Sequence, residues 1–215
     1  ANGALSALKI SMTEEEWETE SILIANRIRT WSHNVVEKKH KAFNNLPACP
    51  FARKAWLQHK VMIHVTESLD AVLEIKAVNP PTQDITYIFA WTGWKEMSQD
   101  DFADWIYAQN ENHFGVWLAA FHPEGYEASP MSAEGNVDEI FAEVDDICII
   151  LMQEYDHLVA SSEQLEKSGY YDNYSEEEKS VLRERQEKLH AWKRQQTHIN
   201  QTSPFEEEEG YEITH

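Results

Sequence analysis

The stretch Asn44-Asn-Leu-Pro-Ala-Cys-Pro-Phe-Ala-Arg-Lys-Ala-Trp56 lies between a predicted long helix and the first strand of a predicted sheet. Pro47 and Pro50 fix their own φ angles and favour extended geometry in the residues that precede them. A helix that arrives from upstream therefore ends before Pro47. Between the two prolines stands Cys49, one of the 2 cysteines in the chain. We expect a stiff corner that holds a thiol.

Upstream of this corner the sequence predicts one long amphipathic helix over residues 12–43. Thr13 and Glu16 have the spacing of a capping box, in which each side chain bonds the other residue's backbone N–H group. Apolar residues then recur along one helical face. They are Trp17, Ile24, Ile28, Trp31 and Val35.

Downstream of the corner, residues 58–122 predict the core of a sheet. Short apolar, β-branched runs at 60–65, 85–91 and 115–121 alternate with helical patterns at 68–78 and from Ser98 onward. Strand starts that lie 25 and 30 residues apart are typical of βαβ units with parallel strands. The fold class is therefore α/β (or α+β), with a small three- to four-stranded sheet and crossover helices. An antiparallel or ferredoxin-like strand arrangement remains an alternative.

The rest of the chain, residues 136–198, predicts two C-terminal helices. The first begins at the Asn136 capping box and runs to about Lys167, with Cys148 on its apolar stripe and Gly169 as a left-handed cap. The second begins at Ser175, and its narrow apolar stripe suits one-sided packing or a homo-oligomer seam. We expect one globular domain over residues 1–198 and a disordered acidic tail over residues 199–215.

The charge limits the partners that we expect. The chain carries 38 acidic and 18 basic residues, for a net charge of −20. Nucleic acid and anionic membranes both require a basic surface, so neither is an expected partner. The apolar runs are too short to cross a bilayer, the first residues lack a signal-peptide pattern, and 2 cysteines make no disulfide framework. We expect a cytoplasmic protein.

A candidate site lies where the predicted strands end. Ligands of parallel α/β sheets bind outside the carboxyl ends of the strands. His122 follows the third strand, Glu124 lies two residues further on, and Trp94 lies in the loop after the second strand. His122 is a candidate general base, and Glu124 and Trp94 are candidate substrate-binding residues. A histidine that only caps a turn is an equally good interpretation.

Metal binding has weaker support in the sequence. No Cys-x-x-Cys or His-Glu-x-x-His pattern is present. A site assembled only in the folded chain would draw on His113, His122 and Glu124, with Cys49 as a further candidate.

Cys49 is the candidate nucleophile. If residues 51–56 form a helical turn, Cys49 is its N-cap, and the free amides, together with Arg53 and Lys54, favour the thiolate. Arg53 and Lys54 are then candidate substrate-binding residues for an anionic group. The alternative is a small residue buried in a tight corner, and composition by itself favours that alternative.

Three segments together resemble a known family. Trp31-Ser-His-Asn-Val-Val36 and Leu46-Pro-Ala-Cys-Pro-Phe-Ala-Arg53 resemble the N-terminal signature of bacterial domain-of-unknown-function family 1415. Val116-Trp-Leu-Ala-Ala-Phe-His-Pro123 is similar to its second signature. The resemblance covers about residues 22–127, departs from the family at Glu124-Gly-Tyr126, and implies that Cys49 and His122 belong to one site. It implies no activity.

Three functional hypotheses follow. The first is an enzyme or ligand-binding protein for a small molecule, with its site between Cys49 and His122. The second is a non-enzymatic interaction protein, viral or accessory, that binds a basic protein through its acidic surface, the Tyr-rich loop at 170–174 and the last helix. The third is a metal- or haem-binding protein, since residues 47–52 are loosely similar to the Pro-Cys corner of haem-dependent N-hydroxylases.

Overall fold

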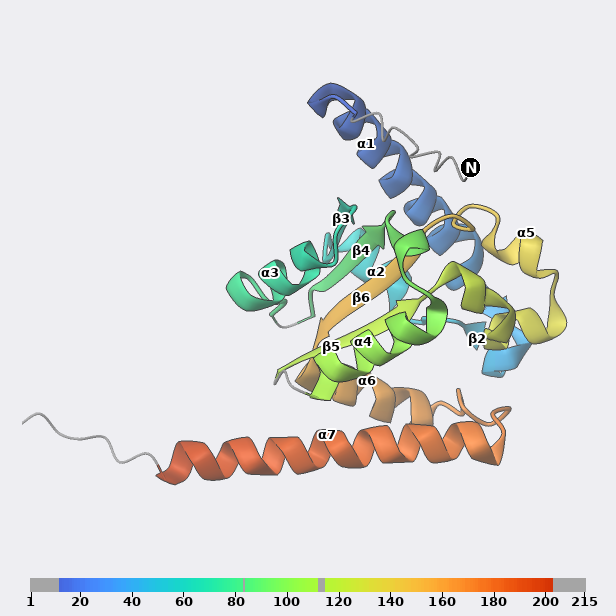
Figure 1. Cartoon of the computed structure of the whole chain (residues 1–215). Helices are drawn as coiled ribbons and strands as arrows, with labels where there is room; N and C mark the ends of the chain where they lie inside the picture. The colour runs from blue at the N-terminus through green and yellow to red at the C-terminus, as the bar shows by residue number, and fades with distance from the viewer. Residues whose placement is uncertain (1–11, 83, 112–114, 203–215) are drawn as a thin grey trace, which may run out of the picture. The chain divides into compact units, whose positions relative to one another are not determined.

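A computed structural model describes residues 12–82, 84–111 and 115–202 of the chain (Figure 1). The chain forms two compact units, of which the first ends at Asn173 and the second begins at Tyr174. The expectation of one domain over residues 1–198 stays a prediction. The first unit contains the sheet and every candidate site residue.

The first unit is built on a four-stranded sheet with the strand order β3-β4-β6-β5 (Figure 1). Its strands are β3 (Val61–Thr66), β4 (Thr86–Trp91), β5 (Val116–Phe121) and β6 (Cys148–Glu154). β3 and β4 are parallel, whereas β6 runs antiparallel to both of its neighbours, β4 and β5. β3, β4 and β5 therefore point the same way. The predicted α/β class, with a small sheet, a long N-terminal helix and C-terminal helices, is confirmed.

One face of the sheet carries a cluster of buried core residues. Alternate residues of the central strands, such as Phe89 and Ile150, are completely buried there, because successive side chains of a strand point to opposite faces. Val72 of α3 (Asp70–Val78) and Phe102 of α4 (Gln99–Glu111) pack into the same cluster. Both helices lie where the sequence predicts them. On the other face, Trp117 packs edge-on against Tyr155.

The single helix predicted from Asn136 to about Lys167 is wrong. This segment contains the five-residue helix α5 (Val137–Phe141), strand β6, and helix α6 (Tyr155–Lys167). Cys148 is buried as expected, but it begins a strand and is paired with Trp91 of β4. The physical reason is that residues 147–152 are uninterruptedly apolar, and such a run satisfies a helical stripe and a fully buried strand equally well.

The N-terminal helix is shorter than predicted. α1 spans Glu14–Trp31 and begins with the predicted capping box of Thr13 and Glu16. A π-helical turn, η1 (Ser32–Val36), follows, in which the Glu37 N–H group donates to the Ser32 carbonyl at 2.8 Å. The helix therefore ends before residue 37 instead of at residue 43, because this wider turn changes the direction of the chain.

A two-stranded hairpin forms the corner. β1 (Lys39–His40) pairs antiparallel with β2 (Leu46–Pro47), and the 3₁₀ turn η2 (Lys41–Phe43) lies between them. Asn44 and Asn45 both adopt positive φ, which asparagine tolerates better than most residues. Helix α2 (Ala52–Leu57) follows Pro50, so the helical turn considered for residues 51–56 is present.

The segment at 123–135, predicted as a loop, forms two 3₁₀ turns. They are η4 (Pro123–Ala128) and η5 (Pro130–Glu134), and each has proline at its first position. A third 3₁₀ turn, η3 (Trp94–Glu96), follows β4. These turns position side chains at the edge of the sheet where β4 and β5 end.

The second unit is the helix α7 (Glu176–Thr202) with the residues around it. Its start is the predicted capping box, in which Ser175 and Glu178 exchange two hydrogen bonds. Residues 199–202 are helical, so the predicted disorder is wrong for them, and residues 203–215 lie outside the described residues. Gly169, with φ of +76°, ends α6 as expected. Among the described residues, no helix has the length and apolar character needed to cross a membrane.

Candidate functional site

His122 caps the turn that follows β5. Its Nδ1 accepts a hydrogen bond from the Glu124 N–H group at 3.3 Å, and its side chain is only 3% exposed. An imidazole that accepts at Nδ1 carries its proton on Nε2. The Nε2 atom is buried without a hydrogen-bond partner within the described chain. In this conformation His122 acts as a helix cap and is sealed from solvent.

The structure brings two predicted site residues to His122. The Trp94 ring lies edge-on to the imidazole, with the ring centroids 5.2 Å apart, and Phe102 lies on another side at 5.5 Å. Trp94 Nε1 also donates to the Asp146 carbonyl at 2.8 Å. Glu124 approaches His122 Nδ1 at 4.0 Å with a mostly exposed carboxylate. The expected grouping of His122, Glu124 and Trp94 is present, but Trp94 and Phe102 cover the imidazole.

Cys49 lies in the corner, but the prediction that it is the N-cap of α2 is wrong, because α2 begins at Ala52 and its N-cap residue is Phe51. The N–H groups of Phe51 and Ala52 point at its sulfur and lower the pKa of the thiol. Burial raises this pKa by more than the amides lower it, and the nearby carboxylate of Glu37 raises it further. The expected thiolate is therefore not favoured, because desolvation outweighs the helix-end amides.

The other parts of the proposed Cys49 site do not assemble around the thiol. Arg53 and Lys54 are exposed on α2, and neither contributes to the shift of the Cys49 pKa. Within the described chain, no hydrogen bond or ion pair joins Cys49 to His122. A shared site for Cys49 and His122 stays a prediction.

A buried carboxylate next to the corner was not found from the sequence. Glu37 has a 5% exposed side chain and accepts from Arg29 Nη1 at 2.5 Å and from Ser32 Oγ at 3.2 Å. Ser32 Oγ in turn accepts from Trp56 Nε1 at 2.8 Å. The Arg29 guanidinium lies 4.7 Å above the Trp56 ring. This network fastens the π turn to α2 and stabilises the shape of the corner.

The Tyr-rich loop fastens the other side of the corner. Tyr170 is buried, stacks on Phe43 with ring centroids 5.1 Å apart, and donates from its hydroxyl to the Ala48 carbonyl. Asn44 donates to the Gly169 carbonyl at 3.0 Å. Tyr170 is thus a packing residue, so it offers no surface to a protein partner. Binding of a basic protein elsewhere on the acidic surface stays a prediction.

We predict a definite order of thiol reactivity. In the native protein Cys49 reacts with iodoacetamide faster than the fully buried Cys148, but several-fold more slowly than the same cysteines do in urea. The reason is that burial raises the pKa of both thiols. Mass spectrometry of alkylated peptides against time measures both rates. Labelling of native Cys49 as fast as in urea would contradict a shielded thiol.

The metal hypothesis gains no further ligands. Within the described residues, no group of three or more His, Cys, Asp or Glu side chains is placed to hold a metal ion. His113 lies outside the described residues. Haem contact through Cys49 stays a prediction.

A cleft of about 410 Å³ lies between the corner and the turns that follow His122. We call it the charged cleft. Its first wall comes from the π turn and β1, and its residues are Asn34, Val35, Lys38, Lys39 and His40. This wall carries the two lysine charges and leads directly into the corner hairpin.

The second wall of the charged cleft comes from η5, from α5 and from Glu143, which lies shortly after α5. Its residues are Met131, Glu139, Ile140 and Glu143. At one place the walls meet, where Asn34 Nδ2 donates to Glu143 Oε1 at 3.4 Å. The charges are therefore sorted by wall, with cations on the first and carboxylates on the second.

One feature of the sequence marks the first wall of this cleft. Residues 38–41 read Lys-Lys-His-Lys, which is a basic run in a chain with a net charge of −20. Such a local excess of positive charge indicates a place where an anionic group is bound. The second wall had no such signal, because its residues were assigned to a loop and a long helix.

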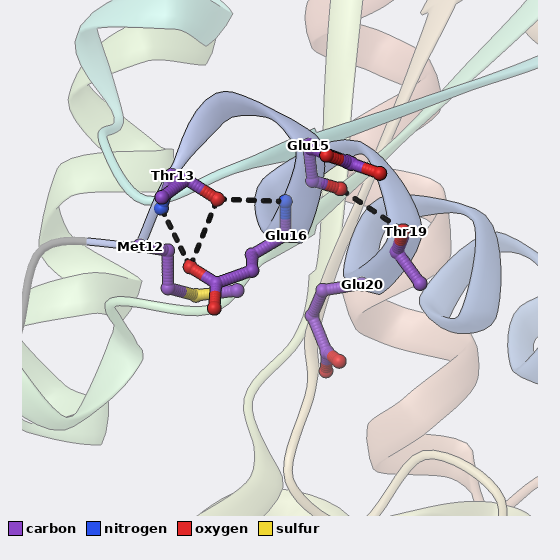
Figure 2. Close-up of a pocket in the computed structure, with 6 residues that line it drawn as sticks. All are labelled: Met12, Thr13, Glu15, Glu16, Thr19 and Glu20. Atoms are coloured by element: carbon purple, nitrogen blue, oxygen red, sulfur yellow. Dashed lines mark hydrogen bonds between the residues drawn. The ribbon is translucent and has the colours of Figure 1, made fainter.

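In two further hollows, the main polar groups are already bonded to one another. The first lies at the start of α1 and is lined by Thr13, Glu16 and neighbouring acidic residues (Figure 2). Its Thr13 and Glu16 groups bond one another in the capping box, so they serve the helix end (Figure 2). The second holds the Lys60–Asp84 ion pair beside Glu154 and His157. The one lysine of this hollow, Lys60, is therefore already paired with Asp84.

Comparison of the chain with protein-family models, with curated proteins and with solved structures gave no match. The resemblance to family 1415 therefore rests on the three quoted segments and stays a proposal. The structure joins two of these segments, because the Cys49 N–H group donates to the Val36 carbonyl at 3.2 Å.

Proposed function

We propose that this protein binds a small molecule non-covalently in the charged cleft. The cleft lies between the Cys-Pro corner and the turns that follow His122, and none of the site residues predicted from the sequence lines it. The observation that supports the proposal is the set of unpaired charges on its walls. Within the described chain, Lys38, Lys39 and Glu139 each make no ion pair, although they share one cleft.

The dimensions of the cleft fit this role. Pockets for small ligands typically enclose about 300–1,000 Å³ and combine apolar lining with a few polar groups. The charged cleft has about 410 Å³, and the half-buried Val35 and Ile140 and the buried Met131 supply apolar surface. Its polar groups come from both walls. This is the composition of a recognition site.

Binding has better support than covalent catalysis at Cys49. A cysteine nucleophile needs a lowered pKa or an adjacent base. The pKa of Cys49 is raised by burial, and His122, the predicted base, is bonded at Nδ1 and covered by Trp94. The charged cleft needs no such activation, since its charges are open to a ligand.

We predict that a tryptophan in the cleft abolishes ligand binding. Thermal unfolding is followed with a panel of amino acids, peptides, carboxylic acids, amines, sugars and nucleosides. A ligand present at 100 times its dissociation constant stabilises the native protein by about 2.7 kcal/mol. We expect at least one panel member to raise the melting temperature of the native chain, and to have no effect on Glu139→Trp.

Asp138→Trp is the matched control. Asp138 is an exposed acidic residue on the same helix, next to Glu139, and lies outside the cleft lining. The control loses the same charge and gains the same ring, so its ligand response should equal that of the native chain. An equal response in Glu139→Trp, or no response to any panel member, would contradict the proposed function.

A further inference from the structure

We infer that the ligand of the charged cleft is a short zwitterion with an aliphatic body, of the class of a dipeptide. Its carboxylate would lie against Lys38, Lys39 and His40, and its ammonium against Glu139 and Glu143. This inference rests on the proposed function and names the chemistry of its ligand.

The first step is that His40 presents a hydrogen-bond donor. His40 Nδ1 accepts from the Ala42 N–H group at 3.2 Å. Nε2 therefore carries a hydrogen whether the ring is neutral or charged. Within the described residues no acceptor meets Nε2, and His40 is part of the cleft lining. A ligand oxygen is the partner that this N–H group lacks.

The second step is that the first wall favours an anion. Lys38 and Lys39 are exposed and make no ion pair within the described chain, and they line the cleft together with His40. Two ammonium groups and an imidazole N–H form a cationic donor set. A carboxylate can accept from several such donors, and hydrogen bonds to a charged acceptor are the stronger ones. The first wall therefore suits the carboxylate of a ligand.

The third step is that the second wall favours a cation. The Glu139 carboxylate has no ion-pair partner among the described residues. Glu143 accepts only one long hydrogen bond in the cleft, from Asn34. A ligand that carried only negative charge would leave both carboxylates repelling it. A ligand that carried only positive charge would be repelled by the first wall. Opposite charges at the two ends of one molecule satisfy both walls.

The last step concerns the body of the ligand. Val35, Ile140 and Met131 also line the cleft and are apolar. A sugar or a nucleoside would leave hydroxyl groups against these side chains without partners, which is unfavourable. An aliphatic side chain loses nothing there. A dipeptide also separates its two charges by more than a single amino acid does, as a ligand between two walls requires.

The test uses leucyl-leucine and two blocked forms in isothermal titration calorimetry on the full chain. Leucyl-leucinamide lacks the carboxylate, and N-acetyl-leucyl-leucine lacks the ammonium. We expect the zwitterion to bind at least about tenfold more tightly than either blocked form, because each form leaves one wall uncompensated.

Charge variants assign each end of the ligand to a wall. Lys38→Gln/Lys39→Gln should weaken leucyl-leucine and the N-acetyl form but should not weaken the cationic amide, which loses a repulsion. Glu139→Gln should weaken leucyl-leucine and the amide but should not weaken the anionic N-acetyl form, which likewise loses a repulsion. Lys41→Gln, in the same basic run but outside the lining, is the matched control and should change none of the affinities.

The outcomes separate the two proposals. Equal affinity for all three peptides, or variant effects on the wrong blocked form, would overturn the zwitterion. If no peptide binds while another panel compound binds and is blocked by Glu139→Trp, the zwitterion is overturned and the cleft stands. If no compound responds to Glu139→Trp, both proposals fall.

Discussion

Replacement of Phe141 by alanine is expected to lower the free energy of unfolding by about 3–5 kcal/mol. Phe141 is 2% exposed and stacks on Tyr126 with the ring centroids 4.3 Å apart. Trp31 lies on another side at 6.3 Å. Because the pocket is formed by large rigid rings, it cannot collapse around alanine, and a cavity remains. Urea unfolding followed by circular dichroism measures the loss.

The same substitution should destabilise the wall of the charged cleft that α5 forms. Phe141 ends the five-residue helix α5, which presents Glu139 and Ile140 to the cleft. So short a helix has little stability without packing. Phe141→Leu keeps most of the volume and should cost less than about 1.5 kcal/mol. Val78→Ala, at an exposed position, should change stability by less than about 0.5 kcal/mol. Equal stability of Phe141→Ala and Phe141→Leu would contradict this packing.

A stability change with pH is expected from Lys76. Burial lowers the pKa of its ammonium from 10.5 to about 8, and its Nζ donates to the Gln109 carbonyl at 2.9 Å. Between pH 8 and pH 10.5 the unfolded chain keeps a proton that the native chain has released. More protons bound in the unfolded state mean that stability rises with pH. The penalty of burying the charge is therefore present at neutral pH and disappears above pH 10.5.

Lys76→Met isolates this contribution. Methionine retains the packed stem of the side chain and carries no charge. The free energy of unfolding of Lys76→Met therefore lacks the rise with pH that Lys76 causes in the native chain. The native chain should gain up to about 3 kcal/mol relative to Lys76→Met between about pH 7.5 and pH 10.5. Urea unfolding of both proteins at each pH measures the difference. This comparison cancels the buried thiols, whose raised pKa values act in the opposite direction in both proteins. Parallel pH profiles would show that Lys76 releases no proton on folding.

Local signals in the sequence sufficed for several elements. The Thr13 and Ser175 capping boxes mark the true helix starts, because they depend on residues only three positions apart. The runs that become β3, β4 and β5 are short and bounded by turn residues, so their type is unambiguous. Gly169 adopts the left-handed conformation that its place after a helix predicts.

The tertiary structure decided the central strand. The apolar run that contains Cys148 has no period that separates a buried strand from a helix. Only the free hydrogen-bonding edges of β4 and β5 convert it to β6, and those edges come from residues more than 25 positions away in the sequence. The charged cleft depends on the formation of β6 as well, because α5, which lines the cleft, ends before β6 begins.

The Cys-Pro corner, too, was determined partly by the local sequence and partly by the tertiary structure. Its prolines determined, without further information, that the upstream helix ends and that the chain turns there. Burial and the nearby Glu37 carboxylate raise the pKa of the Cys49 thiol, and neither can be read from the residues next to Cys49 in the sequence. The charged cleft likewise needs two segments nearly 100 residues apart, and only folding brings their charged residues into one cleft.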